Sequence, residues 1–92
     1  MTFCIKLSPL AQEHLDFWKH SGKISVIKKI ARIFEELESH PMEGTGQPEK
    51  LKGNLQGYWS RRITKADRMV YKVMGEDVLV SIVSIKGHYG DK

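Results

Sequence analysis

The 92-residue sequence predicts one α+β domain, in which two helices pack on a mostly antiparallel, twisted sheet in the order β-α-α-β-β-β. Two observations support this fold class. Apolar residues in the first 40 positions recur at intervals of three and four, which is typical of helices. From residue 51 the interval becomes two, which is typical of strands. Because a chain this short supports one hydrophobic core, residues 1–92 are expected to form a single domain.

A short strand and a first helix open the chain. Residues 2–7 are β-prone in rough alternation and predict a strand. Ser8 is a good N-cap and Pro9 suits the first helical position, so a helix is expected over 9–20. One helical face carries Ala11, Leu15 and Trp18. Cys4, the one cysteine, is expected to be a small buried apolar residue.

A second helix and a loop follow. The helix begins near residues 23–25 and ends before Pro41, because the residue before a proline disfavours helical geometry. Its apolar stripe consists of Val26, Ile27, Ile30, Ile33, Phe34 and Leu37. Residues 41–50 contain two glycines and two prolines and predict an ordered loop.

The second half of the chain predicts strands. Alternation of apolar residues begins at 51–55, and full strands are expected over residues 58–63, 68–73 and 78–85. Residues 65–67 are few enough to join antiparallel strands, and residues 75–77 predict a turn. The last strand is rich in β-branched residues, so we expect it in the centre of the sheet.

Composition narrows the class of protein. With 40% apolar and 28% charged residues and no low-complexity tract, the chain is neither disordered nor a disulfide scaffold. No apolar run approaches the ~18–20 residues of a membrane span, and the first residues do not resemble a secretory signal. Together with the lone cysteine, these features lead us to expect a cytoplasmic protein without a membrane association.

Charge is distributed unevenly along the chain. Residues 1–49 hold six basic and seven acidic residues, whereas residues 50–92 hold nine basic and four acidic ones. The whole basic excess therefore lies in the strand half. A basic surface of this kind favours a nucleic-acid partner, although many small proteins are mildly basic without one.

The sequence contains no motif for a metal or a cofactor. Its histidines, at positions 14, 20, 40 and 88, have no second ligand at a metal-binding spacing, and one cysteine is too few for structural zinc. Phosphate-binding glycine motifs and the G-x-S-x-G motif of hydrolases are also absent from the sequence. An enzyme built from this chain is expected to use no cofactor.

The remaining polar residues are suited to cutting RNA without a metal. Such a reaction needs a base for the 2′-hydroxyl proton, an acid for the 5′-oxygen and cations for the phosphorane charge. The candidates are Glu49, Lys50, Lys52, Arg61, Arg62, Arg68, His88 and Tyr89. Each one taken alone could equally be structural or solvated. Arg61 and Arg62 are adjacent, so only one of them can join a given site.

The order of these residues resembles a known family. The segments are Gly44-x-Gly46-x-Pro48-Glu49-x-Leu51-Lys52, Gly57-x-Trp59-Ser60-Arg61-Arg62-Ile63-Thr64, Arg68-x-Val70-Tyr71 and Gly87-His88-Tyr89. They resemble the YoeB/Txe toxins of the RelE superfamily over nearly the whole chain. The resemblance implies a RelE-like fold and a bacterial type II toxin. Such a toxin is a ribosome-dependent mRNA endonuclease that cuts in the A site and inhibits translation.

The resemblance also implies a role for each matching residue. Glu49 would be the general base, Arg68 would stabilise the transition state, and His88 would be the general acid. Tyr89 would position the substrate. Substrate and RNA binding would involve Lys52, Arg61, Arg62 and Lys86. The products would be a 2′,3′-cyclic phosphate and a 5′-hydroxyl, with no metal in the reaction.

The chain departs from the family pattern near its end. Ile85-Lys86 replaces a Cys-Arg pair, which keeps a positive charge but loses the bidentate fork of arginine. Residues 90–92 extend past the terminal His-Tyr pair and displace the carboxylate from Tyr89. Neither departure removes a principal site residue.

The expected partners also follow from the resemblance. They are the ribosome, mRNA and a cognate antitoxin of the YefM/Axe type, with operator DNA bound only through the antitoxin complex. A homodimer is a further expectation. Two alternatives remain open: a non-catalytic ParE-like toxin that acts on DNA gyrase, and an RNA-binding module without activity. The His88-Tyr89 ending together with Glu49 and Arg68 favours the nuclease.

Overall fold

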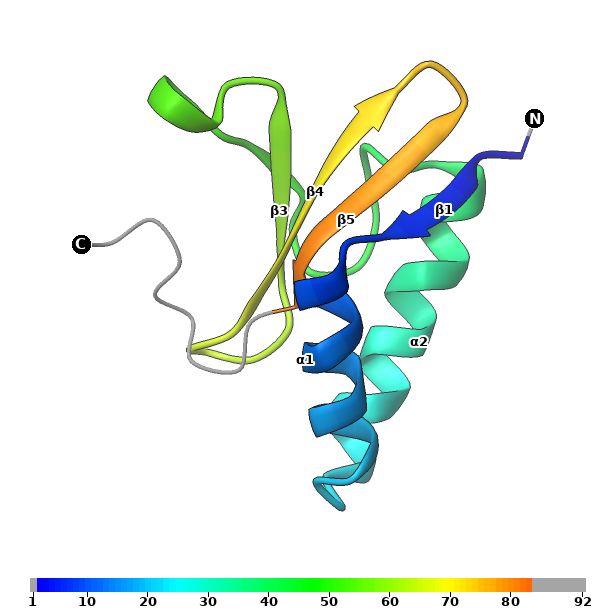
Figure 1. The fold of residues 1–92 in the computed structure, drawn as a ribbon, viewed down its shortest axis with the longest axis vertical. Coiled ribbons are helices and arrows are strands. Elements are labelled where there is room, and N and C mark those ends of the chain that lie inside the picture. The colour runs from blue at the N-terminus through cyan, green and yellow to red at the C-terminus, as the bar shows by residue number, and fades with distance from the viewer. Residues whose placement is uncertain (1, 84–92) are drawn as a thin grey trace.

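A computed structural model describes residues 2–83, in which a pair of helices lies against a five-stranded sheet (Figure 1). The helices, α1 (Pro9–Lys19) and α2 (Ile24–Ser39), contact each other and lie on the same side of the sheet. The strands are β1 (Cys4–Leu7), β2 (Glu49–Lys50), β3 (Tyr58–Arg62), β4 (Arg68–Met74) and β5 (Asp77–Val83). The predicted α+β class is confirmed.

The strands are ordered β1-β5-β4-β3-β2 across the sheet. Each of the pairs β2–β3, β3–β4 and β4–β5 is antiparallel, whereas β1 pairs in parallel with β5. β5 therefore has a hydrogen-bonded neighbour on each side, as predicted for the β-branched strand. Its expected extension through residues 84 and 85 lies outside the described residues.

Both helices begin and end where the sequence predicts. The Ser8 hydroxyl accepts a hydrogen bond from the Ala11 backbone N–H at 3.0 Å and caps α1, with Pro9 at the first helical position. α2 ends at Ser39, two residues before Pro41. In residues 2–83, no helix combines the length and the apolar character needed to span a bilayer.

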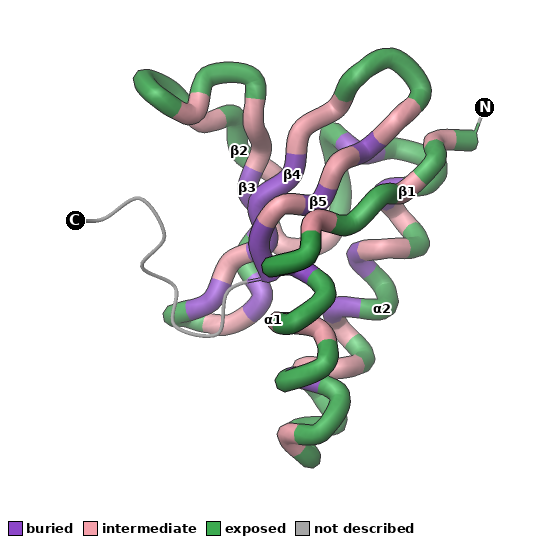
Figure 2. Tube along the Cα trace, in the orientation of Figure 1, coloured by how far each residue is buried: buried purple, intermediate pink, exposed green. Residues whose placement is uncertain are grey.

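The core lies between the helices and the inner face of the sheet. The helices contribute Ala11, Trp18, Ile30, Ile33 and Leu37, and the strands contribute Met69, Tyr71, Val78, Val80 and Val83. Figure 2 shows buried segments on β3, β4 and β5 and a largely exposed β1. The prediction that Cys4 is buried is wrong, because β1 is the edge strand and its first residue is exposed.

The segment between α2 and β3 differs most from the predictions. Its last two residues, Glu49 and Lys50, form β2 by pairing with Ser60 and Trp59 of β3. The alternation predicted at 51–55 is wrong, because residues Gly53–Leu55 form a 3-10 turn, η1, instead. A φ of +67° at Gly53 turns the chain back toward β3, so β2, η1 and β3 together make a hairpin.

Candidate functional site

Alternation along β3 directs neighbouring side chains to opposite faces of the sheet. Trp59 packs against the core and Arg61 bonds to α2, so both point toward the helices. Ser60 and Arg62 consequently project to the opposite side, called the outer face here. The sequence analysis predicted that Arg61 and Arg62 could not share a site, and this prediction is confirmed.

Three of the predicted site residues meet on the outer face. Glu49 stands opposite Ser60 in the register of β2 and β3, and Arg68 stands opposite Arg62 in that of β3 and β4. Residues paired in this way project to the same side of a sheet. They line a pocket of about 240 Å³, the carboxylate–arginine pocket, formed by Gly46, Gln47, Pro48, Glu49, Arg62 and Arg68.

The pocket is held in shape by close contacts between the loop and β3. The backbone N–H of Arg62 donates to the Gly46 carbonyl at 2.7 Å. Gly46 has a φ of +85°, and a Cβ on it would lie 2.7 Å from the Arg62 carbonyl oxygen, so only glycine fits there. Across the pocket, the Arg68 guanidinium donates to the Ser60 hydroxyl at 3.3 Å.

This arrangement suits the chemistry of a phosphodiester. Glu49 and Arg62 are exposed, and Arg68 is half-buried, so each of them can reach a ligand in the pocket. A carboxylate can take a proton from a hydroxyl, and planar guanidinium groups bind two phosphate oxygens at once. Within residues 2–83, no three His, Cys, Asp or Glu side chains are grouped as they would be around a metal ion.

The prediction that Arg61 contacts RNA is wrong, because its side chain is fully buried. Its guanidinium forms a salt bridge with Glu36 at 2.6 Å and donates from Nε to the Tyr71 hydroxyl at 3.1 Å. Further hydrogen bonds run to the backbone carbonyls of His40 (3.2 Å), Glu43 (2.8 Å) and Thr45 (3.2 Å). Arg61 thus ties α2, the following loop and the sheet together.

Arg61, its partners and the Pro41 carbonyl, which accepts from Tyr71, form a polar group around the buried guanidinium. We call it the Arg61 network: Glu36, His40, Pro41, Glu43, Thr45, Arg61 and Tyr71. Burial alone would raise the pKa of Glu36, but hydrogen bonds from Thr45 and Arg61 and the Arg61 charge outweigh it, so this pKa is lowered. Burial raises the pKa of Tyr71, whose hydroxyl donates to the Pro41 carbonyl at 2.6 Å.

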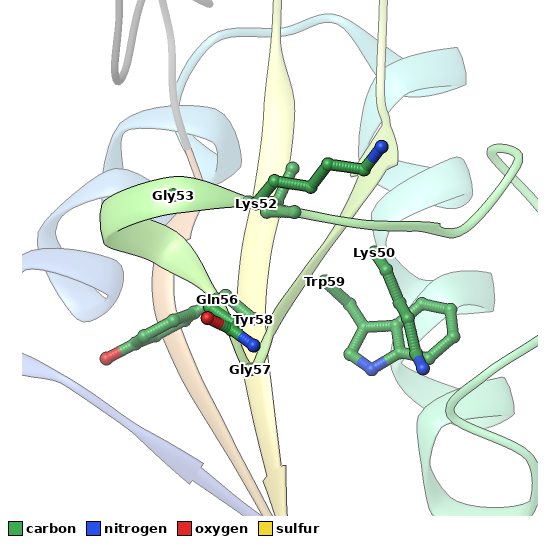
Figure 3. Close-up of a pocket in the computed structure, with 8 residues that line it drawn as sticks. Lys50, Lys52, Gly53, Gln56, Gly57, Tyr58 and Trp59 are labelled. Carbon is green, nitrogen blue, oxygen red and sulfur yellow. The ribbon is translucent and has the colours of Figure 1, made fainter.

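The other predicted residues lie elsewhere. Lys52 lines a separate pocket of about 540 Å³ at the β2–β3 hairpin (Figure 3). We call this the hairpin pocket, and its lining residues are Lys50, Leu51, Lys52, Gly53, Gln56, Gly57, Tyr58 and Trp59. Lys86, His88 and Tyr89 lie outside the described residues.

The sequence analysis also missed how α1 holds the end of β5. The Ser8 hydroxyl donates to the Ser81 carbonyl at 2.7 Å, and the Val83 N–H donates to Nδ1 of His14 at 3.0 Å. Burial lowers the pKa of His14, and the neighbouring Glu13 charge opposes this only in part. The neutral imidazole is therefore favoured, and its Nδ1 can accept the hydrogen bond.

Comparisons with known proteins extend the resemblance seen in the sequence. Residues 8–89 match the family model described as the YoeB-like toxin of bacterial type II toxin–antitoxin systems. A toxin YoeB of Escherichia coli K12 is 40% identical over 73 residues, which cover 79% of this chain and 83% of that protein. A toxin YoeB of Streptomyces coelicolor is 46% identical over 72 residues, which cover 78% of this chain and 82% of that protein.

Solved structures show the same fold. A YoeB/ParE toxin from Agrobacterium tumefaciens superposes with a TM-score of 0.82 at 30% identity, over 95% of this chain and all (100%) of that one. A YoeB dimer from Staphylococcus aureus superposes with a TM-score of 0.80 at 34% identity, over 97% of this chain and 100% of that one. A chain of a YoeB–YefM complex from the same organism superposes with a TM-score of 0.79 at 34% identity, over 97% of this chain and 100% of that one.

Proposed function

The chain belongs to the family of YoeB-like toxins and is the toxin of a bacterial type II toxin–antitoxin system, and from this premise we propose that it is a ribosome-dependent endoribonuclease. It cleaves mRNA in the ribosomal A site and thereby inhibits translation. The reaction is an attack by the RNA 2′-hydroxyl on the adjacent phosphorus. It leaves a 2′,3′-cyclic phosphate on one fragment and a 5′-hydroxyl on the other.

One observation carries this proposal: Glu49, Arg62 and Arg68 line a single pocket on the outer face. Glu49 takes the proton from the attacking 2′-hydroxyl. Arg62 and Arg68 bind the phosphate oxygens and stabilise the negative charge that builds up on the phosphorane. Their guanidinium planes match two oxygens each, which a lysine cannot do.

The remaining roles are proposed for His88, Tyr89, Lys52 and Lys86. His88 protonates the 5′-oxygen as it leaves, because an imidazole titrates near neutral pH. Tyr89 positions the substrate, and Lys52 and Lys86 contact the RNA backbone. Arg61 takes no part in RNA contact, because the Arg61 network encloses its guanidinium.

The proposal includes partners. A cognate YefM-type antitoxin would bind this toxin, in line with the YoeB–YefM complex from Staphylococcus aureus, and the complex would bind its own operator DNA through the antitoxin. A homodimer is proposed by analogy with the Staphylococcus aureus YoeB dimer. The toxin would act in the cytoplasm, where it meets translating ribosomes.

Primer extension on a defined mRNA tests the proposal. The purified toxin and its His88→Ala variant are incubated with the message, with and without programmed ribosomes. We expect a cut in the A-site codon only when ribosomes are present, and no cut by the variant. If the folded toxin leaves ribosome-bound mRNA intact, the nuclease proposal is wrong, and a gyrase assay would test the ParE-like alternative.

A further inference from the structure

The hairpin pocket, at about 540 Å³, is larger than the carboxylate–arginine pocket, at about 240 Å³. The two share no lining residue. They adjoin each other, because Glu49 lines one and Lys50, the next residue of β2, lines the other. One ligand of extended shape could therefore pass from the first pocket to the second around the sheet edge formed by β2.

The lining of the hairpin pocket combines cations with aromatic rings. Lys50 and Lys52 contribute positive charge, and none of the lining residues within the described part of the chain is acidic. The Lys50 ammonium lies 5.9 Å from the centre of the Trp59 ring, and the Lys50 side chain overlaps this ring in the view of Figure 3. On the other side of β3, the Lys72 ammonium lies 5.4 Å from the centre of the Tyr58 ring.

Glycines leave the backbone of the hairpin open to a ligand. A Cβ on Gly53 would meet nothing within 4 Å, and one on Gly57 would meet only the end of the Lys72 side chain at 3.7 Å. Among residues 2–83, no side chain therefore blocks approach at either position. The exposed backbone groups of this turn add hydrogen-bonding capacity to the cavity that the lysines and rings line.

We propose that the hairpin pocket is a second RNA site, in which an unpaired base stacks on Trp59 while Lys50 and Lys52 contact the flanking phosphates. The proposal rests on the RNA-cleaving function proposed above, and adds a binding site separate from the reacting phosphate. Stacking of bases on aromatic rings beside basic side chains is how proteins hold single-stranded RNA. The base takes the place over the ring that the Lys50 ammonium holds, and Lys50 turns to a phosphate.

An acidic peptide is the other ligand that lysines could attract. It would use the positive charges but would gain little from a flat ring. A nucleotide uses both, because its phosphate pairs with the lysines and its base covers the ring. The pairing of rings with cations at this hairpin therefore favours RNA over a peptide.

The test measures binding of the full chain to a short single-stranded RNA oligonucleotide that is 2′-O-methylated throughout. This probe cannot be cleaved by attack of a 2′-hydroxyl, so binding is measured whether or not the toxin is a nuclease. Fluorescence anisotropy gives the affinity at several salt concentrations. The variants are Lys50→Gln, Trp59→Leu and Trp59→Phe, with Lys28→Gln as the control for loss of one exposed charge on α2.

We expect Trp59→Leu to weaken binding about tenfold, and Trp59→Phe to restore most of it, because phenylalanine still offers a ring face. Lys50→Gln should weaken binding and lower the slope of log affinity against log salt by about 0.7, the value for one phosphate contact on a single strand. Lys28→Gln should change neither the affinity nor the slope.

A probe with abasic positions tests stacking directly. The unaltered chain should bind the abasic probe about tenfold more weakly than the complete probe. The Trp59→Leu variant should bind the two probes with equal affinity, because it has no ring on which a base can stack. Binding that is equal for the unaltered chain, Lys50→Gln and Trp59→Leu would overturn the proposal. So would stronger binding of an acidic peptide of the same length. Cleavage on the ribosome is scored separately, so failure of either proposal can be recognised without the other.

Discussion

Arg61 and Arg62 are adjacent on β3, yet their surroundings are opposite. Arg61 is fully buried on the helix side, and its donors reach the Glu36 carboxylate, the Tyr71 hydroxyl and three loop carbonyls. Arg62 is exposed on the outer face, beside Glu49 and Arg68. Burial and hydrogen bonding thus give one guanidinium a structural role and leave the other accessible to a ligand.

The two regions also depend on each other. The Arg61 network fixes the loop that follows α2, through the carbonyls of His40, Glu43 and Thr45. The same loop continues into Gly46 and Glu49, which line the carboxylate–arginine pocket. The Arg61 network on the helix side of the sheet therefore supports the geometry of the carboxylate–arginine pocket on the outer face.

Replacing Arg61 should have the largest effect. Arg61→Ala leaves Glu36 and the loop carbonyls without their shared donor, so we expect the free energy of unfolding to fall by about 3–5 kcal/mol. Urea denaturation measures this loss. The matched variant Arg62→Ala should change stability by about 0.5 kcal/mol or less, because the side chain is exposed. Equal losses in the two variants would show that the contrast between the two arginines is wrong.

Gly46→Ala should have the next largest effect. The new Cβ would lie 2.7 Å from the Arg62 carbonyl oxygen at a positive φ, so the loop must move away from β3. We expect a loss of about 2 kcal/mol or more in unfolding free energy, and slower RNA cleavage because Glu49 moves with the loop.

Gly53→Ala is the control for Gly46→Ala. Gly53 has a φ of +67°, but a Cβ there meets nothing within 4 Å, so only the cost of the positive φ of about 1–2 kcal/mol remains. A thermal or urea unfolding curve compares the two variants. If Gly46→Ala and Gly53→Ala lose the same unfolding free energy, the close approach of the loop to β3 contributes nothing to stability.

Glu36→Gln should reduce stability by about 1–3 kcal/mol near neutral pH, because the hydrogen bonds from Thr45 and Arg61 lose their charged acceptor. The pKa of Glu36 is lowered from its ordinary value of 4.5, so the ionised form contributes stability above that pH. This contribution is lost as the pH falls through the folded-state pKa. Unfolding curves over a pH series should show the two proteins converging in acid; a constant gap would contradict the account.

His14→Ala should have the smallest effect, about 1 kcal/mol, because one hydrogen bond from the Val83 N–H loses its acceptor. The pKa of His14 is lowered from 6.5, so the unfolded chain takes up a proton at a higher pH than the folded one. This stability is present above pH 6.5 and declines as the pH falls below it. The same decline in His14→Ala would assign the pH dependence to other groups.

Most of the fold could be predicted because its signals are local. The spacing of apolar residues, the Ser8-Pro9 cap and the position of Pro41 determine where the helices lie. β2 was not predicted, because two residues form a strand only by pairing with β3, which follows later in the chain. The exposure of Cys4 likewise depends on which strand is the sheet edge.

The site could be predicted in part. The sequence identified Glu49, Arg62 and Arg68, and the register of β2, β3 and β4 brings them together. It placed Arg61 and Arg62 on opposite faces but did not say which of them is buried, although Arg61 alternates in step with Trp59 and Ile63, which was the available signal. The Glu36 partner could not be found, because it lies 25 residues away on another element.

The most direct test of the central claim is the cleavage rate of ribosome-bound mRNA by Arg68→Gln, measured on protein whose unfolding free energy has been determined. We propose that Arg68 stabilises the phosphorane, and its guanidinium lies outside the Arg61 network. Replacing it should therefore lower the cleavage rate on the order of 100-fold with nearly unchanged stability. Cleavage at the unaltered rate by the folded variant would contradict it.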